Sequence, residues 1–229
     1  MKKILFTFSL LLCYLLSWGQ IITTNPTFIT KDYPGEIEII YDATQGTAGL
    51  KDYTGDVYAH TGVITSSSTS PSDWKHAPVW GDNSPKYKLT SLGNNKWKLL
   101  ITPNMAGYYN LSPGEVVRKL AFVFRNSTGT LQGKDIGGAD IFVTVYESNF
   151  NVAFTFPTSN QSVAIGSSID FTVSSSMSAE LKLSLDNTIL ATQSAATSLT
   201  YSYNFSTAGD YAFIASAKVD NNTVYDTLL

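Results

Sequence analysis

Hydrophobic and polar residues alternate with a period of two along most of this chain after residue 20. Such alternation is typical of a β-strand with one buried and one solvated face, whereas an amphipathic helix repeats about every 3.6 residues. No stretch beyond residue 20 has convincing helical periodicity. The pattern predicts an all-β protein, and strands of its first part are expected at 36–42, 56–63, 86–92, 96–102, 117–126 and 140–147.

Two of these strands are predicted to form a hairpin. The segments KYKLTSL and KWKLLIT flank Gly93-Asn94-Asn95, and glycine and asparagine adopt the left-handed backbone that a tight hairpin turn requires. Trp97 alternates with lysines in the second strand, so we expect its ring in the core.

Composition changes after Asn149, where Ser and Thr become abundant and positive charge becomes sparse. This change predicts two β-sandwich domains of the immunoglobulin-like or early-set kind, at 21–149 and 150–229. The second is expected to be truncated, because VYDTLL ends the chain without a polar tail. Tyr211 follows a glycine break and is placed as a tyrosine corner, with its ring in the core and its hydroxyl bonded to upstream backbone. Strands of this domain are expected at 150–156, 167–174, 179–185, 188–193, 199–205, 210–218 and 223–229.

The first twenty residues have the features of a cleaved secretory signal peptide. Lys2 and Lys3 precede an apolar stretch from Ile4 to Leu16 that is too short to span a membrane. The mature chain is therefore expected to have no transmembrane segment and to be secreted, extracellular or at the cell surface, with the periplasm also open. Cys13, the only cysteine, lies inside the signal, and the large Leu12 before it argues against a lipid anchor.

Charge and motif content exclude several function classes. The formal net charge is −3 and no basic run occurs, which argues against nucleic-acid binding. Only His60 and His76 are present, without zinc-ligand spacing or a nucleophile-elbow motif, and His60 is expected to be a partly buried, hydrogen-bonded strand residue. No pair of carboxylates is singled out for glycoside hydrolysis. The chain as given is therefore predicted not to be an enzyme.

A glycine-rich stretch, GKDIGGADIF at 133–142, is the one candidate metal site. Asp135 and Asp140 bracket two glycines, so a folded backbone could present two carboxylates and some carbonyls to Ca²⁺. The alternative is a plain turn before the next strand, and two carboxylates alone favour that alternative. No other cofactor is predicted.

Several stretches in order resemble one known module, the N-terminal β-sandwich of secreted bacterial α-amylase-family glycoside hydrolases of the neopullulanase-like kind. The resemblance covers about residues 21–147, whereas the second domain resembles bacterial immunoglobulin-like spacers only generically. It implies an accessory region of a starch-degrading enzyme whose catalytic (β/α)₈ barrel would follow in a longer chain. The barrel and its catalytic residues are missing here, so activity does not carry over. The stretches are IITTNPTFIT, GLKDYTGDVYAHTGVIT, SDWKHAPVWGDN, KYKLTSLGNNKWKLLITP, GEVVRKLAFVFRNSTGT and GKDIGGADIFVTVY.

Within that resemblance, the loop SDWKHAPVWGDN (72–83) has two interpretations. Trp74 and Trp80, with His76 between them, could form a platform on which glucose rings of an α-glucan stack. The two rings could instead pin a long loop onto the sandwich, which the sequence alone favours. Both roles can coexist if one ring is buried and the other exposed. A structural spacer or cell-surface adhesion protein without sugar binding remains the alternative function.

Overall fold

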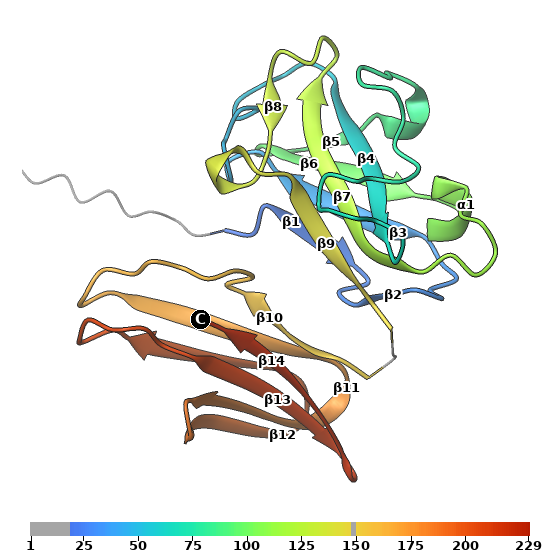
Figure 1. Cartoon of the computed structure of the whole chain (residues 1–229). Helices are drawn as coiled ribbons and strands as arrows, with labels where there is room; N and C mark the ends of the chain where they lie inside the picture. The colour runs from blue at the N-terminus through green and yellow to red at the C-terminus, as the bar shows by residue number, and fades with distance from the viewer. Residues whose placement is uncertain (1–18, 148–149) are drawn as a thin grey trace, which may run out of the picture.

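The structure is a computed structural model that describes residues 19–147 and 150–229. Residues 1–18 of the predicted signal peptide, with Cys13, lie outside the described residues, as do residues 148–149 of the predicted domain junction. Within the described residues, no helix is long and apolar enough to cross a membrane. Strands dominate both parts of the chain, which confirms the all-β prediction (Figure 1).

The first domain is a sandwich of two sheets. Its strands are β1 (Ile22–Asn25), β2 (Ile29–Thr30), β3 (Ile37–Asp42), β4 (Val57–Thr65), β5 (Thr90–Gly93), β6 (Lys96–Ile101), β7 (Val117–Asn126), β8 (Gln132–Gly133) and β9 (Ile141–Tyr146). One sheet has the order β1-β3-β6-β5, and the other has the order β2-β9-β7-β4 with β8 paired to β7. Alternate residues of both sheets meet in one core, where Tyr41 stacks on Phe124 with ring centroids 4.1 Å apart and Trp97 is buried as predicted.

The predicted hairpin is confirmed as β5–β6. Asn94 and Asn95 connect the strands with φ of 51° and 63°, the left-handed values that a two-residue hairpin turn needs. The first predicted strand of this pair is shorter than expected, since Pro85–Tyr87 forms a 3₁₀ turn instead.

One short helix interrupts the strands of the first domain. Helix α1 (Met105–Tyr109) begins at Asn104, whose side chain accepts a hydrogen bond from the Gly107 N–H at 2.8 Å, and ends at Asn110 with φ of 53°. A side-chain cap at the first residue and a left-handed residue after the last favour a short helix. Five residues are too few to show helical periodicity in sequence.

The second domain has five strands rather than the seven predicted. They are β10 (Val152–Phe156), β11 (Ser168–Leu185), β12 (Thr188–Asn204), β13 (Phe213–Val219) and β14 (Asn222–Leu228). Strand β11 runs through two predicted strands, and so does β12. Residues 174–178 and 194–197, which are small except for Met177, continue the two strands with register shifts instead of ending them, and Ala195 takes a φ of 51° there.

Pairing still produces the two layers of an immunoglobulin-like sandwich. The first half of β11 pairs with β10 and with the second half of β12. The second half of β11 pairs with the first half of β12 and with β13, which pairs with β14. Apolar residues of both layers form a single core.

The predicted tyrosine corner is confirmed. The Tyr211 hydroxyl donates to the Thr207 carbonyl at 2.8 Å, four residues upstream, and its ring packs against Tyr203, Phe205 and Phe213. Ring and hydroxyl together fix the chain where it enters β13.

Replacing Tyr211 with Phe keeps the ring and removes this hydrogen bond. We expect the free energy of unfolding to fall by about 0.5–1.5 kcal/mol, the usual net contribution of one hydrogen bond, as measured by urea denaturation. The control is Tyr225→Phe, because Tyr225 is 68% exposed and its substitution should leave the urea midpoint unchanged. Equal midpoints for Tyr211→Phe and the unmodified chain would contradict the corner's stabilising role.

Candidate functional site

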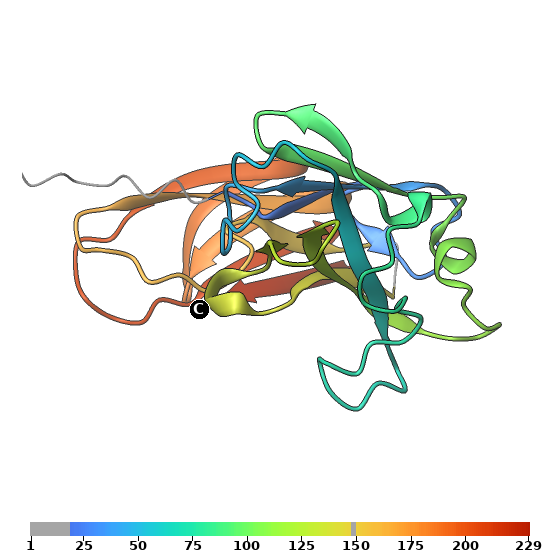
Figure 2. The ribbon, with the colours of Figure 1, turned by 90° about the horizontal axis from the view of Figure 1, so that it is seen from above.

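The outward face of the sheet that contains β4 and β7 is buried although it lies outside the core. Ala121, Val123 and Arg125 alternate with the core residues of β7, yet their exposed fractions are only 0%, 3% and 1%. The covering element is the loop 66–84 between β4 and β5, which projects beside the sheet in Figure 2. The fold therefore has a third layer at this place, made by a loop.

A backbone pair fixes the middle of the loop to β4. Lys75 donates to the Val63 carbonyl at 2.8 Å, and its own carbonyl accepts from the Val63 N–H at 2.9 Å. A Cβ at Gly62 would lie 2.9 Å from the Lys75 carbonyl oxygen and 3.0 Å from the Ala77 Cβ, so glycine is required for this close approach. These two hydrogen bonds also occupy backbone groups on the edge of β4 that does not pair with β7.

His60 on β4 brings the two loop tryptophans together. Its ring stacks on Trp74 with centroids 5.5 Å apart and meets Trp80 edge-on at 4.9 Å. Trp74 also contacts the edge of Phe142 on β9, and its indole N–H donates to the Pro71 carbonyl at 3.0 Å. Trp74 is thus engaged by the protein itself on both its ring and its polar atom, which supports the loop-pinning interpretation for this residue.

Arg125 fixes the C-terminal end of the loop through hydrogen bonds. One guanidinium nitrogen, Nη1, donates to the Asn83 side-chain oxygen at 2.8 Å and to the Asn126 carbonyl at 3.1 Å. The other, Nη2, donates to the Asp82 carbonyl at 2.5 Å, and Asn83 in turn donates to the Ser127 carbonyl at 3.0 Å. The side chain thus connects the 82–83 segment of the loop with the turn that follows β7.

Trp80 lies above this guanidinium with half of its surface open. The carbon of the Arg125 guanidinium is 5.7 Å from the Trp80 ring centroid and 5.5 Å from that of Tyr58, within the range of cation–π contacts. Trp80 is nevertheless 49% exposed, and its neighbour Val79 is 79% exposed. Gly129 approaches the indole so closely that a Cβ there would lie 3.0 Å from Nε1. Trp80 is therefore held in place and exposed at once.

Burial lowers the pKa of the two basic groups beneath the loop. Desolvation lowers the pKa of Arg125, which makes no ion pair within the described residues, although Asp82 opposes that shift. Desolvation, followed by the charge of Arg125, lowers the pKa of His60, while Asp140 acts in the opposite direction. The His60 Nδ1 atom has no hydrogen-bond partner among the described residues, so this histidine is partly buried as predicted but not hydrogen-bonded through that atom.

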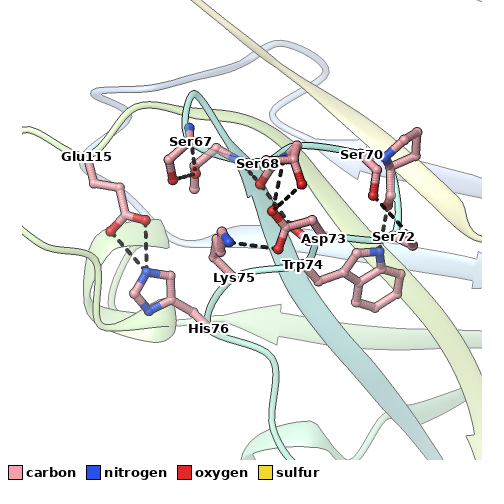
Figure 3. Close-up of polar contacts among 12 residues, drawn as sticks. Ser67, Ser68, Ser70, Ser72, Asp73, Trp74, Lys75, His76 and Glu115 are labelled. Carbon is pink, nitrogen blue, oxygen red and sulfur yellow. Dashed lines mark hydrogen bonds and ion pairs between the residues drawn. The ribbon is translucent and has the colours of Figure 1, made fainter.

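The first half of the loop is ordered by a polar cluster around Asp73 (Figure 3). Its carboxylate accepts from the Lys75 ammonium at 2.7 Å and from the Thr69 N–H at 2.9 Å. The hydrogen bond from Lys75, followed by that from Thr69, lowers the pKa of Asp73. These contacts lie before and after Trp74 and fix the backbone that carries it.

His76 points away from the Trp74 ring and pairs with Glu115 (Figure 3). Its Nε2 lies 2.9 Å from both carboxylate oxygens of Glu115, which also accepts from the Ser112 N–H at 3.1 Å. Burial alone would raise the pKa of Glu115, but the hydrogen bonds from Ser112 and His76 lower it. The hydrogen-bonded pair of His76 and Glu115 lies at a shallow hollow of about 680 Å³, lined by Ser66, Ser67, Trp74, Lys75, His76, Ser112, Pro113, Gly114 and Glu115.

The structure therefore does not bring the three predicted sugar-binding residues together at one place. Trp74 and Trp80 meet around His60, whereas His76 belongs to the hollow on the far side of Trp74. Sugar binding by the three remains a prediction. Arg125 and His60 were not expected to support the loop. The sequence signal for this missed support is the run LAFVF at 120–124. It is apolar at successive positions of β7, as in a strand that is covered on both faces.

The two aspartates of the proposed calcium site have other partners. Asp135 accepts a hydrogen bond from the Ile136 N–H at 2.7 Å, and Asp140 lies 3.2 Å from the Lys134 ammonium. Within the described residues no group of three or more His, Cys, Asp or Glu side chains is arranged to hold a metal ion. Calcium binding stays a prediction from sequence.

Comparisons with known proteins add little to these observations. No protein-family model matches the chain, and no curated protein matches it. Among solved structures, it is similar to the fibronectin(III)-like modules of Clostridium thermocellum CbhA, with 14% identity over 90% of this chain and 91% of that chain and a TM-score of 0.29. A TM-score this low supports no conclusion about function.

The lowered pKa of His60 makes the loop sensitive to acid. Because the folded protein favours the neutral imidazole, the unfolded state binds more protons once the pH falls below 6.5, the ordinary value. We expect the free energy of unfolding to decrease as the pH falls from about 7.5 to about 5.5, and His60→Gln to reduce that decrease. Urea denaturation at several pH values measures it.

The matched control is His76→Gln, which leaves His60 in place and should retain the loss on the acid side. If His60→Gln and the unmodified chain lose stability in parallel over this range, His60 does not carry the effect.

Proposed function

We propose that this chain is a non-catalytic, extracellular sugar-binding module in which Trp80 stacks on the glucose rings of an α-glucan. The observation that carries the proposal is a tryptophan that is 49% exposed while His60 and Arg125 fix its position. A flat indole covers the apolar face of a pyranose ring, and its N–H offers one polar contact. Because the ring is already held, little conformational entropy is lost on binding.

Polar groups beside Trp74 suit a neutral, hydroxyl-rich ligand that extends beyond Trp80. The hollow beside Trp74 presents the Lys75 ammonium, His76 and the Glu115 carboxylate. These groups are paired with one another or with Asp73, so a ligand would share existing hydrogen bonds rather than neutralise a free charge. A shallow site with one stacking ring should bind weakly, with a dissociation constant near about 1 mM.

The proposal places this chain beside a catalytic domain rather than giving it an activity. No carboxylate pair facing across a cleft is assigned, and the sequence resemblance implies a separate barrel for catalysis. A structural spacer without sugar binding is the second candidate, favoured by Trp74, whose ring and indole N–H are both engaged within the protein.

Replacing Trp80 with Ala should abolish sugar binding with little loss of stability, because half of the ring is already solvated. Native gel electrophoresis with and without amylose measures retardation, and thermal unfolding measures stability. Trp74→Ala should instead lower the free energy of unfolding by about 1.5–3 kcal/mol, the contribution expected from burying a large apolar side chain, because the substitution removes that ring. Leu92→Ala is the matched control, since Leu92 is 47% exposed on β5, in the other sheet.

Free migration of the unmodified protein through amylose would reject the platform and leave the spacer. Retardation that persists in Trp80→Ala but disappears in Leu92→Ala would place binding on the other sheet.

The purified chain of residues 21–229 should release no reducing sugar from amylose or pullulan, because its described residues form β-sheets in which no pair of catalytic carboxylates is assigned. A colorimetric reducing-sugar assay on native and heat-inactivated protein tests this expectation. Sugar released only by the native sample would contradict it.

A further inference from the structure

Strand β12 has a long unpaired edge. It extends over 17 residues, Thr188–Asn204, and within the described part of the chain it pairs only with β11. An unpaired edge presents a row of backbone N–H and C=O groups that can bind another strand, so soluble proteins usually block such edges.

The other edges of this protein are short, covered or charged, and that of β12 is not. The backbone of Lys75 covers the edge of β4, β1 and β5 have four residues each, and β14 carries Asp226. Residues 188–204 contain no charged residue, no proline and no glycine. This edge therefore lacks the sequence features that prevent strand pairing.

The free backbone groups can be assigned in the second half of the strand. Phe205 directs both polar groups at the segment that leads into β11, since it donates to the Ser167 carbonyl at 2.9 Å and accepts from the Gly166 N–H at 2.7 Å. Pairing with β11 continues without a register shift from residue 204 back to 198. Because backbone groups alternate along a strand, Thr200 and Ser202 direct theirs at the free edge.

The sequence of this half is self-complementary about Tyr201. If two copies pair antiparallel with Tyr201 opposite its counterpart, Thr200 faces Ser202 of the other copy and Leu199 faces Tyr203. The end residues Ser198 and Asn204 also match as polar partners. Every apolar residue then meets an apolar one and every polar residue a polar one, as favourable cross-strand pairs require.

We propose that the chain forms a symmetric dimer in which residues 198–204 of two copies pair as antiparallel edge strands centred on Tyr201. The occupant of the edge is a second copy because the segment matches itself and carries no charge that would repel its counterpart. Tyr201 and Tyr203 are only half-buried at the rim of the core, and the second copy would cover them. One pair of short strands is a small interface, so the dimer dissociates readily. This proposal does not depend on sugar binding.

A matched pair of double variants tests both the surface and the register. Thr200 and Ser202 are exposed, so Lys or Glu at these positions is compatible with the fold. In the proposed register, T200K/S202K places lysine opposite lysine twice, whereas T200E/S202K places glutamate opposite lysine twice. Both variants share the lysine at 202, which lies across from Asp170 of β11.

Sedimentation velocity of the mature chain between about 10 µM and about 1 mM, the range in which so small an interface dissociates, should show a monomer–dimer equilibrium. T200K/S202K should weaken dimerisation at least about tenfold, and T200E/S202K should dimerise as tightly as the unmodified chain or more tightly. Circular dichroism and urea midpoints establish that each variant is folded.

A monomer at every concentration would overturn the proposal, and the edge would then serve another partner or none. Equal dimerisation of the two variants would also overturn it, because it would place the contact elsewhere.

Discussion

The guanidinium of Arg125 lies under a loop, on the side of the sheet that faces away from the core, and no carboxylate forms an ion pair with it within the described residues. A buried charge costs several kcal/mol unless hydrogen bonds replace its water. Here the carbonyls of Asp82 and Asn126 and the side chain of Asn83 replace it at Nη1 and Nη2, whereas the buried Nε has no hydrogen-bond partner among the described residues. The loop must therefore close for Arg125 to be buried, and Arg125 must be buried for the end of the loop to be fixed. The position of Trp80 depends on this mutual requirement.

The same loop separates two roles that the sequence could not assign to individual residues. Trp74 is held by its ring and its indole N–H, while Trp80 rests on Arg125 and His60 with half its surface open. Trp74 is partly buried, the polar cluster around Asp73 fixes the backbone before it, and the Lys75–Val63 backbone pair fixes the chain between the two tryptophans. The contacts that pack Trp74 and the contacts that hold Trp80 exposed therefore belong to the same loop.

Strand periodicity, turn residues and one tyrosine were sufficient to predict most of the fold. Period-two alternation located the main strands, Gly93-Asn94-Asn95 located the hairpin, and the glycine break before Tyr211 located the corner. The continuity of β11 and β12 was not predictable, because runs of serine and alanine resemble turns in sequence yet continue a ladder when both neighbours pair. The support beneath Trp80 was not predictable either, since Arg125 lies 45 positions further along the chain and only the β4–β7 pairing brings it under the loop.

The most direct test of the central claim observes the indole N–H groups while sugar is added. A chain that begins at residue 21, after the predicted signal peptide, has three tryptophans, Trp74, Trp80 and Trp97, and their ¹H–¹⁵N resonances can be assigned by single Trp→Phe substitutions. On addition of maltoheptaose to about 10 mM, well above the expected dissociation constant, the Trp80 resonance should shift in a saturable way while that of the buried Trp97 stays fixed. An unshifted Trp80 resonance at this concentration would contradict the account.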